Sequence, residues 1–229
     1  MIDFNLMIDR YLEREIKQKE IGRYYPSEIG SCLRKVWYAY KIPKETPKEL
    51  RRIFEAGNIL HDFVARVLRS DKNPDVELLE SELPFKFEYE DFVISGRIDN
   101  VLLLKVEEKK ILVEVKSCKS LYYIDKPKPE HETQLQFYMW AMRIHNGILL
   151  YIEKNTLNSK IFAVPFDEKR AIAIADRFKT LHECLKVNKL PPAEAKNDNR
   201  MNWMCRYCDW KDECDINSLN LIERNHKQD

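Results

Sequence analysis

The chain has 229 residues, of which 44% are hydrophobic and 34% charged, and its formal net charge is +1. The length fits one large domain, which we expect to span residues 1–229, and the near-zero charge excludes a uniformly basic protein that binds nucleic acid over its whole surface. The charged opening MIDFNLMIDRYLEREIKQKE lacks the apolar segment of a signal peptide, and no apolar run reaches the ~20 residues of a membrane span. We therefore expect a cytoplasmic protein without membrane contact.

Hydrophobic periodicity divides the chain into helices, strands and a cysteine-rich tail. Helical spacing covers residues 3–20, 32–40, 49–69, 131–145 and 167–187, with Ser27 as a candidate N-cap in the turn before residue 32. Alternation with a period of two predicts strands over residues 81–90, 92–99, 101–106, 111–117, 146–155 and 160–166. The segment LPPAEAKNDNR then predicts a tether. Strands flanked by helices favour a mixed α/β domain with a cysteine-rich appendage.

The strand ILVEVKS is apolar except for Glu114 and Lys116, which share one face because side chains alternate along a strand. If it forms a hairpin centred on Glu107 and Glu108, Asp99 lies opposite Lys116 and diagonal to Glu114. A slip of one residue would move Asp99 to the other face. Two carboxylates can hold Mg²⁺ or Mn²⁺, and a lysine beside a metal-activated water can stabilise a charged transition state. The alternative is an ordinary surface pair.

Two helices carry further candidates. Spacings of three and four place His131, Gln134 and Tyr138 on one stripe, where Gln134 and Tyr138 could hydrogen-bond a phosphate or the lysine. The alternative is a boundary stripe with Tyr138 half-buried. Gly57 and His61 lie four residues apart on another helix. Glycine inside a helix often marks a close approach, and a neutral imidazole can bind a metal, although a lone helical histidine is more often structural.

The sequence C-x2-C-x5-C lies in the irregular tail and needs a fourth ligand if it binds a metal. The candidate ligands are Cys32, Cys205, Cys208 and Cys214. Cys118 and Cys184 lie in regular elements, so we expect them to be free thiols. Four thiolates suit an iron–sulfur cluster or a structural zinc, and one distant cysteine plus a triplet is unusual for zinc. Unlinked reduced cysteines are the remaining alternative.

The ordered motifs CLRKVWYAY, GNILH, GRID, EVK, QLQFY and C-x2-C-x5-C extend from about Cys32 to Cys214. Together they resemble the CRISPR-associated exonucleases of the Cas-four family, in the RecB-like branch of the PD-(D/E)XK nucleases. The resemblance implies a mixed central β-sheet flanked by helices. It also implies a C-terminal iron–sulfur lobe formed by the Cys32 region and residues 201–216, with the four cysteines above as cluster ligands.

The same resemblance assigns roles to single residues. It implies that the Mg²⁺ or Mn²⁺ ligands are His61, Asp99, Glu114 and the carbonyl of Val115. It makes Lys116 the catalytic lysine and Gln134 and Tyr138 the Q-x3-Y pair that orients the DNA and the lysine. Ile98 stands where the superfamily pattern has proline.

The activity implied is a metal-dependent DNA exonuclease acting on single-stranded DNA or frayed ends, which processes spacer precursors in CRISPR adaptation. The cofactors implied are Mg²⁺ or Mn²⁺ and an iron–sulfur cluster, 4Fe–4S in preference to 2Fe–2S. Proteins of the integrase complex are the suggested partners. One alternative is a RecB-like DNA-repair nuclease. The other is a non-catalytic metal-knuckle module that binds DNA, which would not need Asp99, Glu114 and Lys116 together.

Overall fold

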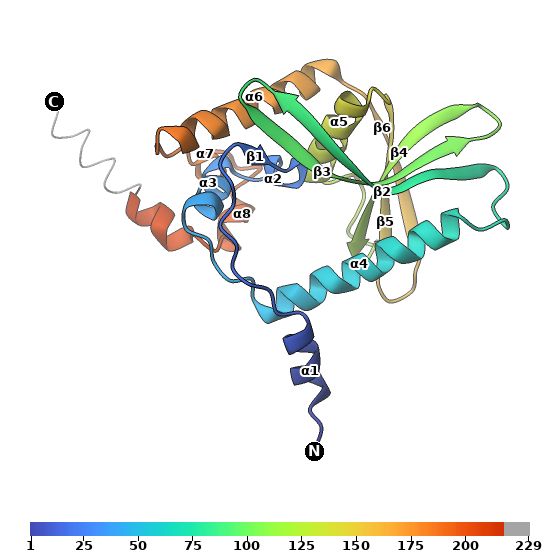
Figure 1. Ribbon diagram of the computed structural model, residues 1–229, viewed down its shortest axis with the longest axis horizontal. Coiled ribbons are helices and arrows are strands. Elements are labelled where there is room, and N and C mark those ends of the chain that lie inside the picture. The colour runs from blue at the N-terminus through green and yellow to red at the C-terminus, as the bar shows by residue number, and fades with distance from the viewer. Residues whose placement is uncertain (218–229) are drawn as a thin grey trace.

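The apolar segments in the middle of the chain pair into one mixed β-sheet in the computed structural model, which describes residues 1–217 (Figure 1). The strands are β1 (Arg23–Tyr24), β2 (Val76–Tyr89), β3 (Phe92–Leu104), β4 (Lys109–Cys118), β5 (Asn146–Glu153) and β6 (Ser159–Pro165). Their order is β1-β3-β4-β5-β6, with β2 pairing along β3. β1–β3 and β4–β5 are parallel pairs, and the other pairs are antiparallel. The predicted mixed sheet is confirmed.

Helices cover both faces of this sheet. They are α1 (Phe4–Tyr11), α2 (Pro26–Ile29), α3 (Leu33–Lys41), α4 (Lys48–Leu68), α5 (Pro129–Met142), α6 (Glu168–Lys186), α7 (Glu194–Asn197) and α8 (Trp203–Arg206). α4 crosses one face, while α3, α5 and α6 lie on the other (Figure 1). The predicted flanking of the sheet by helices is thus confirmed. Within residues 1–217, no helix is long and apolar enough to cross a membrane.

The two faces of β4 belong to different cores. Val113 and Val115 pack with residues of α4, whereas Leu112 joins the core formed with α5 and α6. Because side chains alternate, Glu114 and Lys116 share the face of Leu112 and point towards α5. The strand is therefore apolar on the α4 side and carries its two charges on the α5 side.

One edge of β3 has an interruption in its pairing. β2 pairs with β3 along its full length, so the other edge carries both β1, at residues 93–94, and β4, at residues 100–104. Between them, residues 95–99 have no strand partner on this edge among residues 1–217. The Tyr138 hydroxyl from α5 instead donates a hydrogen bond to the carbonyl of Arg97 at 3.0 Å. This interruption, which we call the β3 gap, brings Asp99 next to both α5 and α4.

The register of the β3–β4 hairpin differs from the prediction by two residues. Asn100 pairs with Val113, so Asp99 lies level with Glu114 rather than opposite Lys116. The turn is centred one residue earlier than expected, because Leu104 already pairs with Lys109. A shift of two residues preserves the face on which each side chain lies. Asp99 therefore remains beside Glu114, although the predicted pairing is wrong.

Four local predictions also need correction. The helix predicted over residues 3–20 is limited to α1, which buries no side chain and so gains no packing energy that would extend it. Ser27 is not an N-cap, because α2 begins one residue earlier at Pro26. The strands predicted over residues 92–99 and 101–106 are one strand, β3. The predicted tether contains α7 and packs against the domain, with Pro191 buried.

Candidate active site and cysteine pocket

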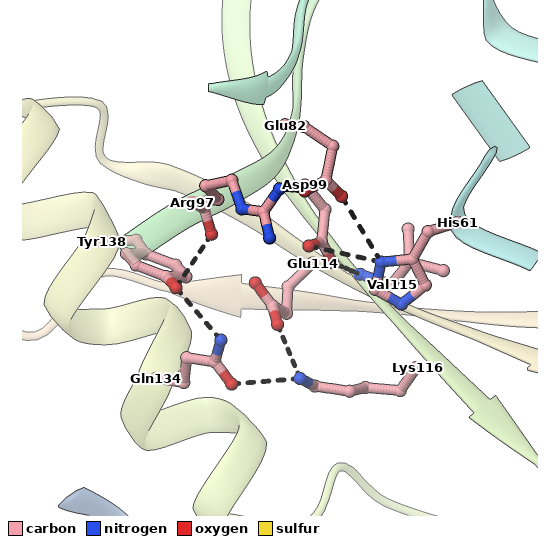
Figure 2. A network of polar contacts seen from close by, with 9 residues as sticks. All are labelled: His61, Glu82, Arg97, Asp99, Glu114, Val115, Lys116, Gln134 and Tyr138. Atoms are coloured by element: carbon pink, nitrogen blue, oxygen red, sulfur yellow. Dashed lines mark hydrogen bonds and ion pairs between the residues drawn. The ribbon is translucent and has the colours of Figure 1, made fainter. Parts of the chain in front are cut away.

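Four of the predicted site residues meet at the β3 gap, from three different elements (Figure 2). His61 comes from α4, Asp99 from β3, and Glu114 and Lys116 from β4. Asp99 Oδ2 accepts a hydrogen bond from the Val115 N–H at 2.7 Å, in place of a strand partner. Its other oxygen, Oδ1, lies 3.4 Å from His61 Nδ1. The Asp99 carboxylate thus links β3 and β4 to α4.

Glu114 is a carboxylate in a nearly dry environment, with 2% of its surface exposed. Its Oε1 lies 2.6 Å from Lys116 Nζ, while its Oε2 is buried without a hydrogen-bond partner in the described part of the chain. Burial, followed by the negative charge of Asp99, raises the pKa of Glu114 to about 7. A buried carboxylate oxygen without a partner is costly, and a bound cation would remove that cost.

A chain of hydrogen bonds fixes the position of Lys116 (Figure 2). Its Nζ donates to Gln134 Oε1 at 3.0 Å, and Gln134 Nε2 donates to the Tyr138 hydroxyl at 3.2 Å. Tyr138 in turn donates to the Arg97 carbonyl across the β3 gap. Gln134 and Tyr138 are both buried, so the predicted stripe lies inside the protein rather than at its boundary. We call this chain the lysine relay.

The charges around Lys116 keep it protonated. Burial alone would lower its pKa, but the neighbouring carboxylates of Glu114 and Asp99 reverse this and raise it. Burial also acts to lower the pKa of His61. The contact of His61 with Asp99 outweighs burial, so the pKa of the imidazole is raised. Burial also raises the pKa of Tyr138, so its hydroxyl remains a hydrogen-bond donor.

Glu82 is a neighbour of this site that the sequence did not indicate. Its Oε1 lies 3.9 Å from His61 Nδ1, and its Oε2 lies 3.4 Å from Arg97 Nη1. Among the described residues, His61, Glu82 and Asp99 are the group of three potential ligands whose atoms lie within 4.8 Å of one another. Glu82 has a φ of +51°, a left-handed conformation that is uncommon for glutamate. The alternation in SELPFKFEYE gives no sign of this local turn, which is why the pattern did not reveal it.

The site opens into a cavity of about 620 Å³, which we call the sheet-edge cavity. Its lining includes His61, Glu82, Asp99, Gln134 and Tyr138 from the site. Three basic side chains also line it, from Arg23, Lys86 and Arg97. The acidic site thus has room for a ligand, and basic side chains form part of the cavity wall.

Two predicted features take no part in the site. His131 does not join the lysine relay: its Nδ1 lies 2.8 Å from the hydroxyl of Tyr151. Burial, then the charges of Lys116 and Lys128, lower the pKa of His131 to about 3, so its imidazole is neutral. The close approach predicted at Gly57 is wrong, because an added Cβ would meet only Ser117 Oγ, at an ordinary 3.6 Å.

Comparison with known families matches residues 26–215 to the model of the PD-(D/E)XK nuclease superfamily. The chain belongs to this superfamily. It is 26% identical over 206 residues to the CRISPR-associated exonuclease Cas4 of Saccharolobus solfataricus, covering 88% of this chain and 92% of that relative. It is also similar to the crystal structure of SSO0001, at 26% identity with a TM-score of 0.57, covering 90% of this chain and 92% of that one. Nucleases of this superfamily use divalent metal ions, and the group formed by His61, Glu82 and Asp99 is a candidate site.

This nuclease has a second candidate site, which shares no lining residue with the sheet-edge cavity. There four cysteines line a cavity of about 290 Å³ that we call the cysteine pocket. The four are those predicted as ligands: Cys32, Cys205, Cys208 and Cys214. Cys118 ends β4 and Cys184 lies in α6, and neither lines the pocket. Basic side chains from Arg34, Lys35, Lys196 and Lys211 also line it.

Side chains outside the cysteine pocket hold its walls together. Arg177 forms a fork on Glu194, with Nη1–Oε1 at 2.6 Å and Nη2–Oε2 at 3.2 Å. Glu194 Oε2 also accepts the Leu33 N–H at 2.9 Å, which anchors the start of α3. Arg34 Nε donates to the Pro191 carbonyl at 2.8 Å. The segment before α8 is therefore fixed against α3, close to Cys32.

Proposed function

We propose that this nuclease is a metal-dependent DNA exonuclease that acts on single-stranded DNA or frayed ends. The observation that carries the proposal is the buried Glu114 oxygen without a partner, beside a lysine whose position is fixed by hydrogen bonds. An ordinary surface pair would be solvated and mobile, and would need neither burial nor the lysine relay. The exonuclease activity named for the Saccharolobus solfataricus relative supports the choice of activity.

The residues fit a hard divalent cation such as Mg²⁺ or Mn²⁺. The ligands we propose are His61, Asp99, Glu114 and the Val115 carbonyl, with Glu82 close enough to add a further oxygen. When bound, such a cation supplies an activated water and neutralises charge on the phosphate. The basic residues around the sheet-edge cavity would bind the flanking phosphates.

Lys116 acts on the charge that develops during hydrolysis. An ammonium group has three N–H donors, and in the described structure Glu114 and Gln134 accept two of them. The third is available for the attacking oxygen or the phosphate. Because the lysine relay holds the ammonium group before substrate arrives, little reorganisation is needed in the transition state.

For the cysteine pocket we propose an iron–sulfur cluster, 4Fe–4S in preference to 2Fe–2S, with a structural role. Such a cluster would be held by Cys32, Cys205, Cys208 and Cys214, which line one pocket. One distant cysteine plus a C-terminal triplet is unusual for a structural zinc, which favours the cluster. Arg34 and Lys35 in the lining would complement the net negative charge of such a cluster. Lys196 and Lys211, which also line it, pair with Asp215.

The proposed organisation is a single nuclease domain, residues 1–229, with a cluster lobe formed by the Cys32 region and residues 201–216; residues 218–229 lie outside the described structure. We also propose that the enzyme processes spacer precursors in CRISPR adaptation alongside proteins of the integrase complex. The name of the Saccharolobus relative supports the association with CRISPR. A RecB-like DNA-repair nuclease is the second candidate, and gene neighbourhood separates the two. The burial of Glu114 against Lys116 disfavours a non-catalytic module, because such a module has no use for a costly buried charge.

The test is digestion of end-labelled single-stranded DNA with Mn²⁺, using protein prepared without oxygen. Lys116→Ala should lower the rate by about 10²- to 10³-fold, while Mn²⁺ affinity and the fold are retained. Asp99→Ala should also stop cleavage, but high Mn²⁺ should partly restore it. Lys110→Ala is the matched control, since Lys110 is exposed on the same strand. Near-normal cleavage by folded Lys116→Ala would refute the proposed mechanism.

A further inference from the structure

The loop between β4 and α5 connects the two elements that supply most of the lysine relay. It comprises residues 119–128, and we call it the tyrosine loop because Tyr122 and Tyr123 lie near its centre. β4 carries Lys116 and α5 carries Gln134. Tyr122 follows Lys116 by six positions, and an extended chain of that length spans at most about 20 Å. The backbone of Tyr122 therefore lies within about 20 Å of the backbone of Lys116.

Hydrogen bonds anchor the tyrosine loop on both sides of the tyrosines. Before them, the Leu121 N–H donates to Glu153 Oε1 at 3.2 Å. After them, the Ile124 carbonyl accepts a hydrogen bond from Lys160 at 2.5 Å, and the Ile124 side chain is buried. At the end of the loop, the Lys128 N–H donates to the hydroxyl of Tyr151 at 3.0 Å. The two tyrosines thus lie on a short, well-anchored segment.

Neighbouring apolar side chains of the loop differ sharply in their exposure to solvent. Tyr122 is 81% exposed and Tyr123 is 83% exposed, whereas Ile124 next to them is 6% exposed. The two rings contact each other edge to face, with centroids 5.0 Å apart and planes at 88°. A neighbouring residue does reach the core, so the loop is able to bury side chains, yet the tyrosines point outwards. Two exposed aromatic rings in contact with each other offer faces on which the bases of a nucleic acid can stack.

The charges of the tyrosine loop favour an anionic ligand. Lys119, Lys126 and Lys128 are exposed, and none of them makes an ion pair with another residue of the described structure. Asp125 is the one acidic residue of the loop, which leaves an excess of positive charge. The side chain of Lys128 lies close enough to His131 to lower its pKa, as does Lys116. Basic side chains therefore extend from the loop as far as Lys116, which is paired with Glu114 in the site.

We propose that Tyr122 and Tyr123 form a base-stacking platform for single-stranded DNA beside the cleavage site. The inference rests on the proposed function, which supplies the substrate, and it adds the residues that hold the strand through its bases. Bases stack on aromatic rings without regard to sequence, and adjacent lysines bind the backbone. Because the loop is anchored and one ring braces the other, little freedom is lost when a base stacks. A protein partner is the competing occupant of these rings, and the experiment below separates the two.

The experiment compares binding of two fluorescent oligonucleotides of equal length, one of thymidines and one of abasic sugar-phosphate, in buffer with EDTA to prevent cleavage. Wild type should bind the thymidine oligonucleotide more tightly. The double variant Tyr122→Ala/Tyr123→Ala should bind it about 5- to 150-fold more weakly for each stacked base and bind the abasic oligonucleotide as wild type does. Tyr122→Phe/Tyr123→Phe should retain binding. Tyr11→Ala, which alters a tyrosine exposed to 76% in α1, is the control for general effects.

Three results would overturn the proposal: equal affinity of wild type for both oligonucleotides, unchanged thymidine binding by the alanine double variant, or equal weakening on both oligonucleotides. Unchanged thymidine binding would assign the rings to another ligand. Equal weakening on both oligonucleotides would assign the effect to contacts with the phosphates. Thermal unfolding of each variant confirms that the exposed substitutions leave the fold intact. Failure of wild type to cleave DNA with Mn²⁺ would instead refute the proposed function, and the binding comparison needs no cleavage.

Discussion

Replacing Glu114 by glutamine should change how the stability of the metal-free protein depends on pH. In the folded protein, burial and the charge of Asp99 raise the pKa of Glu114 from its ordinary 4.5 to about 7. The unfolded chain releases this proton near pH 4.5, whereas the folded protein holds it until about pH 7. The folded state therefore binds more protons between these values, and stability falls as the pH rises through this window. Below pH 4.5 the stabilising contribution is fully present.

The size of the effect follows from the shift. One pKa unit corresponds to about 1.4 kcal/mol, so ionising Glu114 in its buried site should lower the free energy of unfolding by about 3 kcal/mol between pH 4.5 and 7. Glu114→Gln cannot ionise and should lack this part of the pH dependence. Its absolute stability also changes, because Lys116 loses a charged partner. The prediction therefore concerns the slope with pH and not the stability at one pH.

The assay is urea unfolding of both proteins at pH 5 and pH 8 in EDTA, repeated with Mn²⁺. In EDTA, wild type should lose about 3 kcal/mol more than Glu114→Gln between the two pH values. With Mn²⁺, the wild-type trend should reverse, since the cation binds the ionised carboxylate. Glu114→Gln should show little Mn²⁺ stabilisation and no cleavage. Parallel pH profiles for the two proteins in EDTA would refute the assignment of a raised pKa to this buried carboxylate.

Three further substitutions test other parts of the structure. Tyr138→Phe removes the hydroxyl at the end of the lysine relay, so the cleavage rate should fall about tenfold while Mn²⁺ affinity is retained; an unchanged rate would return Tyr138 to a purely structural role. Cys208→Ser should lose bound iron and unfold at a lower temperature, whereas Cys118→Ser should do neither, and equal effects would refute the ligand assignment. Gly57→Ala should raise the free energy of unfolding by about 1 kcal/mol, because the added methyl has room beside Ser117; a lower stability in urea would contradict this.

Side-chain periodicity accounts for what was predictable. An apolar strand with Glu114 and Lys116 at alternate positions has to place both on one face, and a spacing of four has to place Gln134 and Tyr138 on one side of a helix. These rules are local, so they hold whatever the rest of the fold does. The predicted face of Asp99 is therefore correct even though the predicted hairpin register is wrong by two residues, because an even shift preserves the face.

The features that were missed depend on long-range structure. Glu82 reaches His61 only because its backbone turns to a positive φ beside the β3 gap, and no short pattern encodes that conformation. Residues 12–20 have helical spacing, yet α1 ends at Tyr11, because the spacing alone does not supply a surface to pack against. The close approach at Gly57 was predicted from the cost of a glycine inside a helix. The surroundings of Gly57, which depend on the rest of the fold, would accept a methyl group.

The walls of the cysteine pocket have a consequence for how the chain assembles during its synthesis. The contacts that fix the start of α3 come from far downstream: Leu33 is bonded to Glu194, 161 residues later, and Arg34 lies against Cys214, 180 residues later. Every side chain of the lysine relay is translated before residue 139. A nascent chain can thus bring the relay together while the pocket still lacks most of its walls. All four cysteines can hold a cofactor together only once residue 214 has left the ribosome.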